Sequence, residues 1–334
     1  MSDGRGIRYY DSGVVDRSAI DQRPDEGRPG IGELRLDLLT GDWVAMAAHR
    51  QTRVFLPPKE LCPLCPTKPG LLSEIADTSY QVVVFDNKSP SLTAPSHNWD
   101  LPANEGIDTP LTEAAGKCEV ICFTDDHETS FGALSPAQIR IVMEAWRDRT
   151  RALSAVDYIA QVFPFENRGE EVGVTLNHPH GQIYAYSYIT PRTLKMLESA
   201  TLHKAKHNRI LLDDIIAREL KDEVRIIARN EHWIAYVPFA ARYPFEIHVA
   251  PLAGVADLAE LSDAQADDAW QGRTGFVHQA VMDDYPDMRD FQVYACGAPV
   301  MVSAARNDFS SKCHLPEEEF FADSFTSAAD LATN

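Results

Sequence analysis

The residues best suited to catalysis are the two histidines and the glutamine of His178-Pro179-His180-Gly181-Gln182. The flanking sequence is typical of a β-strand, and alternate residues of a strand point to the same side of a sheet. We therefore predict that His178, His180 and Gln182 line one surface. A neutral imidazole can attack phosphorus, and the resulting phosphoramidate is itself a good phosphoryl donor. We therefore interpret the motif as the site of a two-step phosphoryl transfer. The alternative interpretation is that the two histidines merely lie on a polar edge strand.

The other residues of this motif fit the same interpretation. Pro179 has no N–H for a ladder hydrogen bond, which indicates a sheet edge or a bulge. Gly181 has no side chain, and we expect a phosphate to approach the backbone closely there. The amide of Gln182 can bind phosphoryl oxygens without offering a titratable proton.

A second motif, Cys62-Pro63-Leu64-Cys65, has the spacing of two zinc ligands. A structural zinc takes four ligands and the sequence has no second Cys-x-x-Cys, so we expect histidines to complete the set. The candidates at predicted strand ends are His127 and His178. A zinc bound to His178 would orient the strand that presents His180. The spacing alone leaves open a redox dithiol or two packed thiols.

Short strands and capped helices must position these motifs. Residues 33–39 and 43–47 flank the turn Thr40-Gly41-Asp42 and predict a β-hairpin. A serine N-cap, a proline at the first helical position and a glutamine at the third predict a helix that begins after Ser135. A helical stretch is predicted over about 191–221. Further strands are predicted over 81–85, 118–123, 157–163, 172–188, 224–228, 232–237 and near 246–250.

The sequence at the start of the helix after Ser135 recurs later in the chain. Leu134-Ser-Pro-Ala-Gln138 matches Leu261-Ser-Asp-Ala-Gln265 at an offset of 127 residues, and a strand and a loop precede both. We therefore predict an α+β protein of two related antiparallel-sheet halves with flanking helices. The expected parts are a mobile N-terminal arm over 1–32, a first half over 33–192 and a second half over 193–334, diverged after about residue 300.

Composition excludes several classes of protein. The 334 residues include 31 basic and 50 acidic ones, and the net charge of −19 argues against nucleic-acid or anionic-membrane binding. Six cysteines are too few for a disulfide scaffold. We see no transmembrane span and no secretory signal, and we expect a cytoplasmic protein.

A recognisable combination of motifs now emerges in order along the chain. It comprises Leu39-Thr-Gly-Asp-Trp43, His49-Arg50-Gln-Thr-Arg53, Cys62-Pro-Leu-Cys65, Phe85-Asp-Asn87, Val120–His127, Phe165-Glu-Asn-Arg-Gly169, Gly173-x-Thr175, His178-Pro-His-Gly-Gln182, Tyr243-Pro-Phe-Glu246 and Gly297-Ala-Pro299. Over about residues 33–300 the chain resembles the galactose-1-phosphate uridylyltransferase family of the histidine-triad superfamily.

The resemblance implies a ping-pong transfer of UMP from UDP-glucose to galactose 1-phosphate in galactose metabolism, which yields UDP-galactose and glucose 1-phosphate. His180 would carry the uridylyl group and Gln182 would bind its phosphoryl oxygens. The implied zinc ligands are Cys62, Cys65, His127 and His178. The implied substrate contacts are Asn87, Asn167, Gly173 and Thr175, with Leu71 beside the uracil and Arg50 and Arg53 reaching the nucleotide sugar, in the family across a homodimer interface. Hydrolase branches tend to carry a third histidine at the position of Gln182, so the glutamine favours transfer.

The second half departs from the family pattern. Cys296 stands before Gly297-Ala-Pro299, where some members carry a metal-binding histidine, and no His-x-His follows it, so we expect no second metal. The family's lysine-containing substrate segment is not visible in 301–334. Two alternatives therefore stay open: a nucleotide-sugar phosphorylase or adenylyltransferase of the same fold, and a catalytically impaired, zinc-stabilised binding protein.

Overall fold

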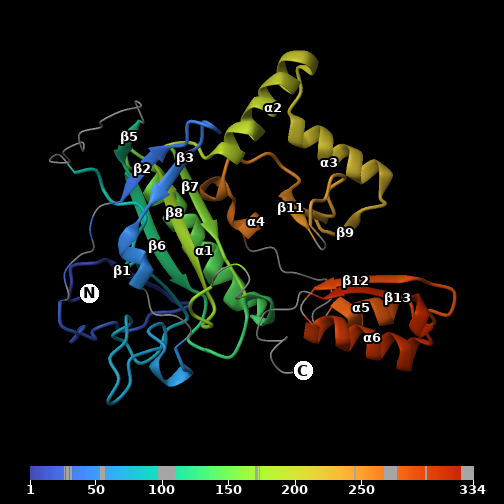
Figure 1. Ribbon diagram of the computed structural model, residues 1–334, viewed down its shortest axis with the longest axis horizontal. Coiled ribbons are helices and arrows are strands. Elements are labelled where there is room, and N and C mark those ends of the chain that lie inside the picture. Colours follow the sequence, from blue (N-terminus) through green and yellow to red (C-terminus); the bar gives the residue numbers. More distant parts are fainter. Residues whose placement is uncertain are drawn as a thin grey trace. The chain divides into compact units, whose positions relative to one another are not determined.

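The computed structural model describes residues 1–25, 27, 30, 32–52, 57–96, 110–169, 172, 174–243, 246–266, 277–297 and 299–324. The chain forms two compact units (Figure 1), Met1–Asp214 with Gly254–Asp268, and Ile215–Ala253 with Ala269–Asn334. The mixture of helices with mainly antiparallel sheets confirms the predicted α+β class. None of the described helices is long and apolar enough to cross a bilayer.

The first unit is built on a five-stranded sheet in the order β1-β4-β6-β8-β7. Its strands are β1 (Ile7–Tyr10), β4 (Val82–Asp86), β6 (Gly116–Cys122), β8 (His180–Tyr186) and β7 (Gln161–Phe165). Every neighbouring pair is antiparallel, and His180 lies opposite Cys122 in the register of β6 and β8. β8 therefore lies inside the sheet, and the edge position suggested by Pro179 is wrong.

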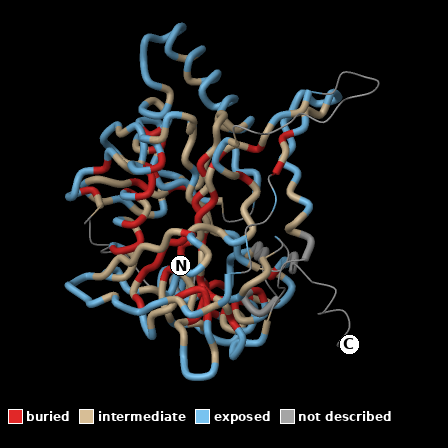
Figure 2. Tube along the Cα trace, turned by 90° about the vertical axis from the view of Figure 1, so that its left-hand side faces the viewer, coloured by how far each residue is buried: buried red, intermediate tan, exposed pale blue. Residues whose placement is uncertain are grey.

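Helix α1 (Pro136–Ser154) covers one face of this sheet and divides the side chains of β8 into two sets. Ile183 and Ala185 are fully buried in the core beneath α1, whereas His180, Gln182 and Tyr184 alternate with them and are half-buried. Figure 2 shows how buried (red), intermediate (tan) and exposed (pale blue) residues are distributed along the chain. The period of two that defines a strand thus separates packing residues from residues that face outward. We call the side opposite α1 the open face.

A buried ion pair fastens α1 to the sheet. Glu119 of β6 is fully buried, and its two carboxylate oxygens accept hydrogen bonds of 2.9 Å from Nε and Nη2 of Arg149 in α1. A bidentate pair of this kind fixes orientation as well as distance. The sequence of β6 predicts a buried strand but not this ion pair, which is seen only in the structure.

The serine cap predicted at Ser135 is present, and Ser262 caps a second helix in the same way. The Ser135 side chain accepts a hydrogen bond from the Gln138 N–H, and Ser262 accepts one from the Gln265 N–H, each at 3.2 Å. A short 3-10 helix precedes each start, η3 (Phe131–Ala133) before α1 and η5 (Leu258–Glu260) before α4 (Asp263–Ala266). The sequence echo therefore corresponds to a repeated local structure.

The remaining elements of the first unit include the predicted hairpin. β2 (Glu33–Leu36) pairs with β3 (Trp43–Met46) and with β5 (Leu111–Glu113) in a small antiparallel sheet. The short helices η1 (Ala48–Thr52) and η2 (Lys59–Leu61) follow it in sequence. The sequence predicts no regular element in residues 1–32, yet β1 lies there, because its backbone extends the main sheet beyond β4.

The long helical stretch predicted over 191–221 is two helices, α2 (Pro191–His207) and α3 (Leu211–Asp222). Asn208 ends α2 in a left-handed conformation with φ of 53°, a common way for a helix to stop. In the second unit β9 (Ile226–Arg229), β10 (Trp233–Tyr236) and β11 (His248–Pro251) form an antiparallel sheet. β12 (Val293–Gly297) and β13 (Phe320–Ser324) run parallel, and the other described helices of this unit are α5 (Val277–Asp284), α6 (Pro299–Cys313) and η6 (Glu317–Glu319). The predicted division at residue 192 stays a prediction.

Gly181 serves packing rather than access to the open face. A Cβ at this position would point toward α1 and would meet Phe123 Cζ and the Phe165 carbonyl oxygen at 2.8 Å each. The interpretation of Gly181 as an opening for a phosphate is therefore wrong, because strand alternation turns the glycine away from the side chains of His180 and Gln182.

We expect Gly181→Ala to lower the free energy of unfolding by about 1–3 kcal/mol, because an added methyl group overpacks the core. Gly132→Ala is the matched control, since a Cβ at Gly132 would meet nothing within 4 Å. Denaturant titration of both variants measures the difference. Equal stabilities would contradict the packing role of Gly181.

Candidate active site and metal centre

Four side chains from three loops converge at one end of the main sheet. Cys62 and Cys65 follow η2, His127 follows β6, and His178 lies two residues before the start of β8. Their ligand atoms all lie within 4.8 Å of one another. Cys65 Sγ lies 3.4 Å from Nδ1 of His127 and 3.5 Å from Nδ1 of His178. The structure thus brings together the four residues that the resemblance implies as ligands.

This cluster fits a tetrahedral metal ion. Metal–sulfur and metal–nitrogen bonds of the lengths found at zinc sites place sulfur and nitrogen about 3.6 Å apart at tetrahedral angles. Burial, together with the neighbouring Cys62 thiol, raises the pKa of Cys65 to about 12, so without a cation this sulfur keeps its proton. Burial lowers the pKa of His178 to about 4, which keeps its imidazole neutral and able to act as a ligand. The four residues could therefore hold a metal ion.

Tyr80 positions the ring of His178, and the sequence analysis missed it. Nε2 of His178 lies 2.8 Å from the Thr124 carbonyl oxygen and 2.8 Å from the Tyr80 hydroxyl. The buried hydroxyl in turn donates to the Leu64 carbonyl, between the two cysteines, at 2.8 Å. These acceptors keep the proton on Nε2 and leave Nδ1 for an ion. No spacing in the sequence connects Tyr80 with residues 98 positions away.

A hydrogen bond to the backbone sets the tautomer of His180. Its Nδ1 lies 2.7 Å from the carbonyl oxygen of His178, which can only accept, so Nδ1 carries the proton. Nε2 therefore presents a lone pair. Partial burial lowers the pKa of His180, which favours the neutral imidazole. His178 itself lies before the strand and is buried, so strand alternation does not apply to it, but it lines the same cavity as His180.

A cavity of about 320 Å³ adjoins both histidines. Its lining includes His127, His178, His180, Glu166, Asn167 and Arg168. The predicted contact Asn167 is thus beside the nucleophile candidate. Burial raises the pKa of the Glu166 carboxyl group in this lining.

Arg50 reaches the open face of β8 within its own chain. It lies in η1 and donates hydrogen bonds to the Ser91 hydroxyl and, at 3.0 Å, to the hydroxyl of Tyr184. Tyr184 belongs to the same face of β8 as His180 and Gln182, since the three alternate along the strand. A guanidinium group is therefore located on the face that presents the candidate nucleophile.

The structure places the other predicted substrate contacts less closely relative to His180. Asn87 follows β4, where its backbone N–H donates to the Cys118 carbonyl at 2.9 Å and its side chain accepts from the Ser89 N–H at 2.9 Å. Thr175 lies between the cavity-lining residues Val174 and Leu176. Leu71 closes a tight turn with Lys68. Arg53 and Gly173 lie outside the described residues.

Comparison with known proteins agrees with the resemblance. Residues 30–190 match the family model described as galactose-1-phosphate uridyl transferase, N-terminal domain, and residues 197–288 match that of the C-terminal domain. The chain is 43% identical over 266 residues to the galactose-1-phosphate uridylyltransferase of Streptomyces lividans, covering 79% of this chain and 69% of that protein. It is 37% identical over 232 residues to the enzyme of that name from Thermotoga maritima, covering 69% and 70%.

Solved structures show the same likeness. A uridylyltransferase structure matches with a TM-score of 0.58 and 27% identity, covering 77% of this chain and 75% of that one. An ADP-glucose phosphorylase from Arabidopsis thaliana matches with a TM-score of 0.51 and 22% identity over 72% and 74%, which shows a likeness in fold alone.

We expect Tyr80→Phe to lower the free energy of unfolding by about 1–3 kcal/mol, because it removes the donor from the buried Leu64 carbonyl. Tyr10→Phe is the control, since the Tyr10 hydroxyl donates to Asp148 at an exposed position, and its loss should cost about 0.5 kcal/mol. Urea unfolding of the two variants provides the comparison. If both lose the same stability, Tyr80 has no special positioning role.

Proposed function

This chain belongs to the galactose-1-phosphate uridylyltransferase family, and on that premise we propose that it transfers UMP from UDP-glucose to galactose 1-phosphate. It is accordingly a nucleotidyltransferase. The observation that supports a covalent route is the hydrogen bond from Nδ1 of His180 to the His178 carbonyl, because it leaves Nε2 unprotonated. An imidazole held in this way is a nucleophile in its resting state.

In the proposed first step, Nε2 of His180 attacks the α-phosphorus of UDP-glucose. The nitrogen–phosphorus bond forms, the bridging phosphorus–oxygen bond breaks, and glucose 1-phosphate leaves with the electron pair. In the second step, a phosphate oxygen of galactose 1-phosphate attacks the same phosphorus and releases the neutral imidazole. The His178 carbonyl accepts the Nδ1 hydrogen bond throughout and stabilises the positive charge on the uridylylated ring.

The surrounding side chains fit an anionic substrate. We propose that Gln182 binds the phosphoryl oxygens and that Arg50, Arg53, Asn87, Asn167, Gly173 and Thr175 bind the nucleotide, with Leu71 beside the uracil. The guanidinium group of Arg50 lies on the His180 face, which supports its assignment to a phosphate or sugar phosphate. Gln182 offers no acid or base at neutral pH, so it does not help water to attack the covalent intermediate.

We propose that the metal of the four-residue cluster is zinc. Two thiolates and two imidazoles would fill all four ligand positions of a zinc ion, so the ion would supply structure rather than Lewis-acid chemistry at phosphorus. Cys62, Cys65, Cys118, Cys122 and Cys313 are free thiols, as in a reducing compartment, which supports a cytoplasmic location. The family resemblance supports a homodimer.

Metal analysis of the purified protein should find close to one zinc ion per chain, and Cys62→Ser should lose the zinc and lower the melting temperature, because the bound metal contributes to folding. Cys118→Ser is the control, as Cys118 is equally a buried thiol but lies outside the cluster. A metal-free preparation that melts at the wild-type temperature would remove the zinc assignment.

Exchange of label between UDP-glucose and glucose 1-phosphate, measured without galactose 1-phosphate, tests the covalent route. We expect the wild-type protein to catalyse this exchange. We also expect it to carry a single UMP adduct, labile in acid, on the peptide that contains His180. His180→Gly should abolish exchange and keep its zinc. His203→Ala, which changes a histidine on α2, should exchange normally.

Two results would contradict the proposal. Exchange with ADP-glucose in place of UDP-glucose would indicate a phosphorylase or adenylyltransferase of the same fold. An adduct on any residue other than His180 would overturn the assigned nucleophile.

A further inference from the structure

Residues 1–25 of the predicted N-terminal arm lie outside the segments that match the family models, yet they are built into the first unit. We use the name N-terminal arm for these residues from here on. Its strand β1 pairs with β4, with Ile7 opposite Phe85 and Tyr10 opposite Val82. Ile7 and Tyr9 pack against the apolar cluster that contains Cys62 and Cys65. The arm therefore contacts both the sheet and the surroundings of the metal ligands.

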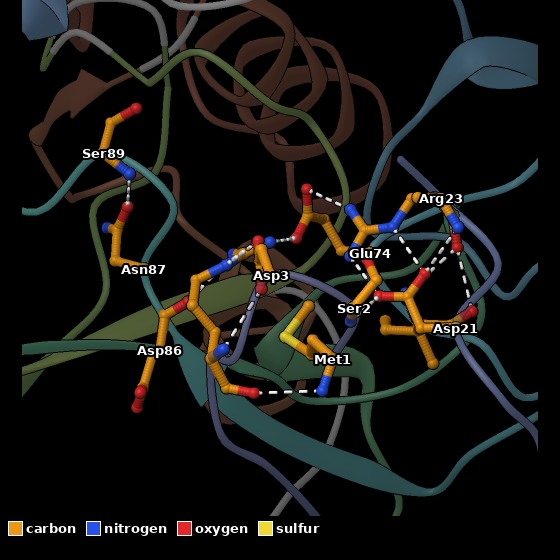
Figure 3. A network of polar contacts seen from close by, with 12 residues as sticks. Met1, Ser2, Asp3, Asp21, Arg23, Glu74, Asp86, Asn87 and Ser89 are labelled. Carbon is orange, nitrogen blue, oxygen red and sulfur yellow. Dashed lines mark hydrogen bonds and ion pairs between the residues drawn. The ribbon is translucent and has the colours of Figure 1, made fainter. Parts of the chain in front are cut away.

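Arg5 is the central residue of a buried polar network in this arm. Figure 3 shows three residues that it contacts, Asp3, Glu74 and Asp86. Its side chain is 8% exposed, and Nη2 donates to the carboxylate of Glu74 at 2.5 Å. Nη1 donates to the Asp86 carbonyl at 3.0 Å, and Nε donates to Asp3 at 2.6 Å. One guanidinium thus connects the arm to the end of β4 and to the loop that bears Glu74.

A second arginine binds the other oxygen of the same carboxylate. Nη1 of Arg23 lies 2.6 Å from Oε1 of Glu74, whereas Arg5 binds Oε2. Asp21 holds Arg23 in place through hydrogen bonds of 2.8 and 3.0 Å, as Figure 3 shows. Glu74 is therefore bound between two arginines that both come from the arm.

Glu74 belongs to the segment that carries the cysteines, which we call the knuckle loop, residues 62–75. The Glu74 N–H donates to the Pro63 carbonyl, between Cys62 and Cys65, at 3.0 Å. Ile75, the next residue, is fully buried and packs in the same cluster as both cysteines. Whatever holds Glu74 in place therefore also holds the half of the metal site that the knuckle loop supplies.

We propose that the N-terminal arm is a clamp on the knuckle loop, with Arg5, Arg23 and Glu74 as positioning residues that set how fast a bound metal ion is released. A buried metal leaves when the loop that carries its ligands opens locally, and contacts made only in the closed form reduce that opening. Opening here requires separation of a buried carboxylate from two guanidinium groups. The inference rests on the four-ligand site of the proposed function but not on UMP transfer.

The competing explanation is that this network stabilises the whole unit without any special effect on the metal. The chain offers a matched control in Glu119, which is also a buried carboxylate bound by arginine but lies on the α1 side of the sheet. Glu74→Gln and Glu119→Gln make the same change of charge with the same shape. Both should lower the melting temperature, because each leaves a buried arginine without its full partner.

The test loads the full-length protein with zinc and follows transfer of zinc to an excess of a chromogenic chelator. We expect Glu74→Gln to release zinc about 10–100-fold faster than wild type, by analogy with the loss of metal affinity when a group that supports a metal ligand is removed. Glu119→Gln should release it at the wild-type rate. Hydrogen exchange should rise in residues 62–75 of Glu74→Gln and remain unchanged in β8.

A milder variant covers the case in which Glu74→Gln does not fold. Arg23→Met removes one of the two guanidinium groups at a position that is 16% exposed, and it should also speed zinc release. Equal release rates for the two carboxylate variants, or an unchanged rate in Arg23→Met, would overturn the clamp, as would a wild-type protein that takes up no zinc. Failure of the UDP-glucose exchange alone would overturn only the proposed transfer.

Discussion

A single residue, His178, connects the four candidate metal ligands to the candidate nucleophile, and the geometry of the site depends on this connection. The His178 ring points Nδ1 at Cys65, while the His178 carbonyl accepts the hydrogen bond from Nδ1 of His180. The ring and the carbonyl that fixes the tautomer of His180 thus belong to the same residue. An ion bound in the cluster would therefore order the nucleophile without touching the substrate.

The same strand must pack a core and present chemistry, and its alternation allows both. On one side Gly181, Ile183 and Ala185 lie against α1, and the bidentate Glu119–Arg149 pair fixes the orientation of that helix. On the other side His180, Gln182 and Tyr184 stay half-buried and meet Arg50. Because packing uses every second residue, the tight fit beneath α1 constrains the backbone from which the functional side chains project.

The sequence predicts those parts of the site whose signals are local, and it fails where contacts are distant. The Cys-x-x-Cys motif and the two serine caps each span only a few residues. In the structure both cysteines lie in the candidate metal site and both serines cap helices. Alternation predicts a common face for His180 and Gln182 but not where the strand begins, and His178 lies before it. The role predicted for Gly181 is wrong because its role depends on contacts with Phe123 and Phe165, which lie outside its own strand. Tyr80 bonds across 98 residues and Arg5 across 69, and no local pattern marks such partners.

The choice of a carbonyl oxygen as the partner of His180 also bears on which reaction the imidazole can perform. A carboxylate in this position, as in serine-protease triads, stabilises the imidazolium ion and suits a residue that takes up a proton. A neutral carbonyl gives less stabilisation, and burial disfavours the charged ring further, so the free imidazole keeps its lone pair. Once a phosphoryl group is attached, the Nδ1–H bears positive charge and bonds the carbonyl more strongly. The carbonyl cannot remove that proton, so the adduct stays cationic and remains a good phosphoryl donor for the second step.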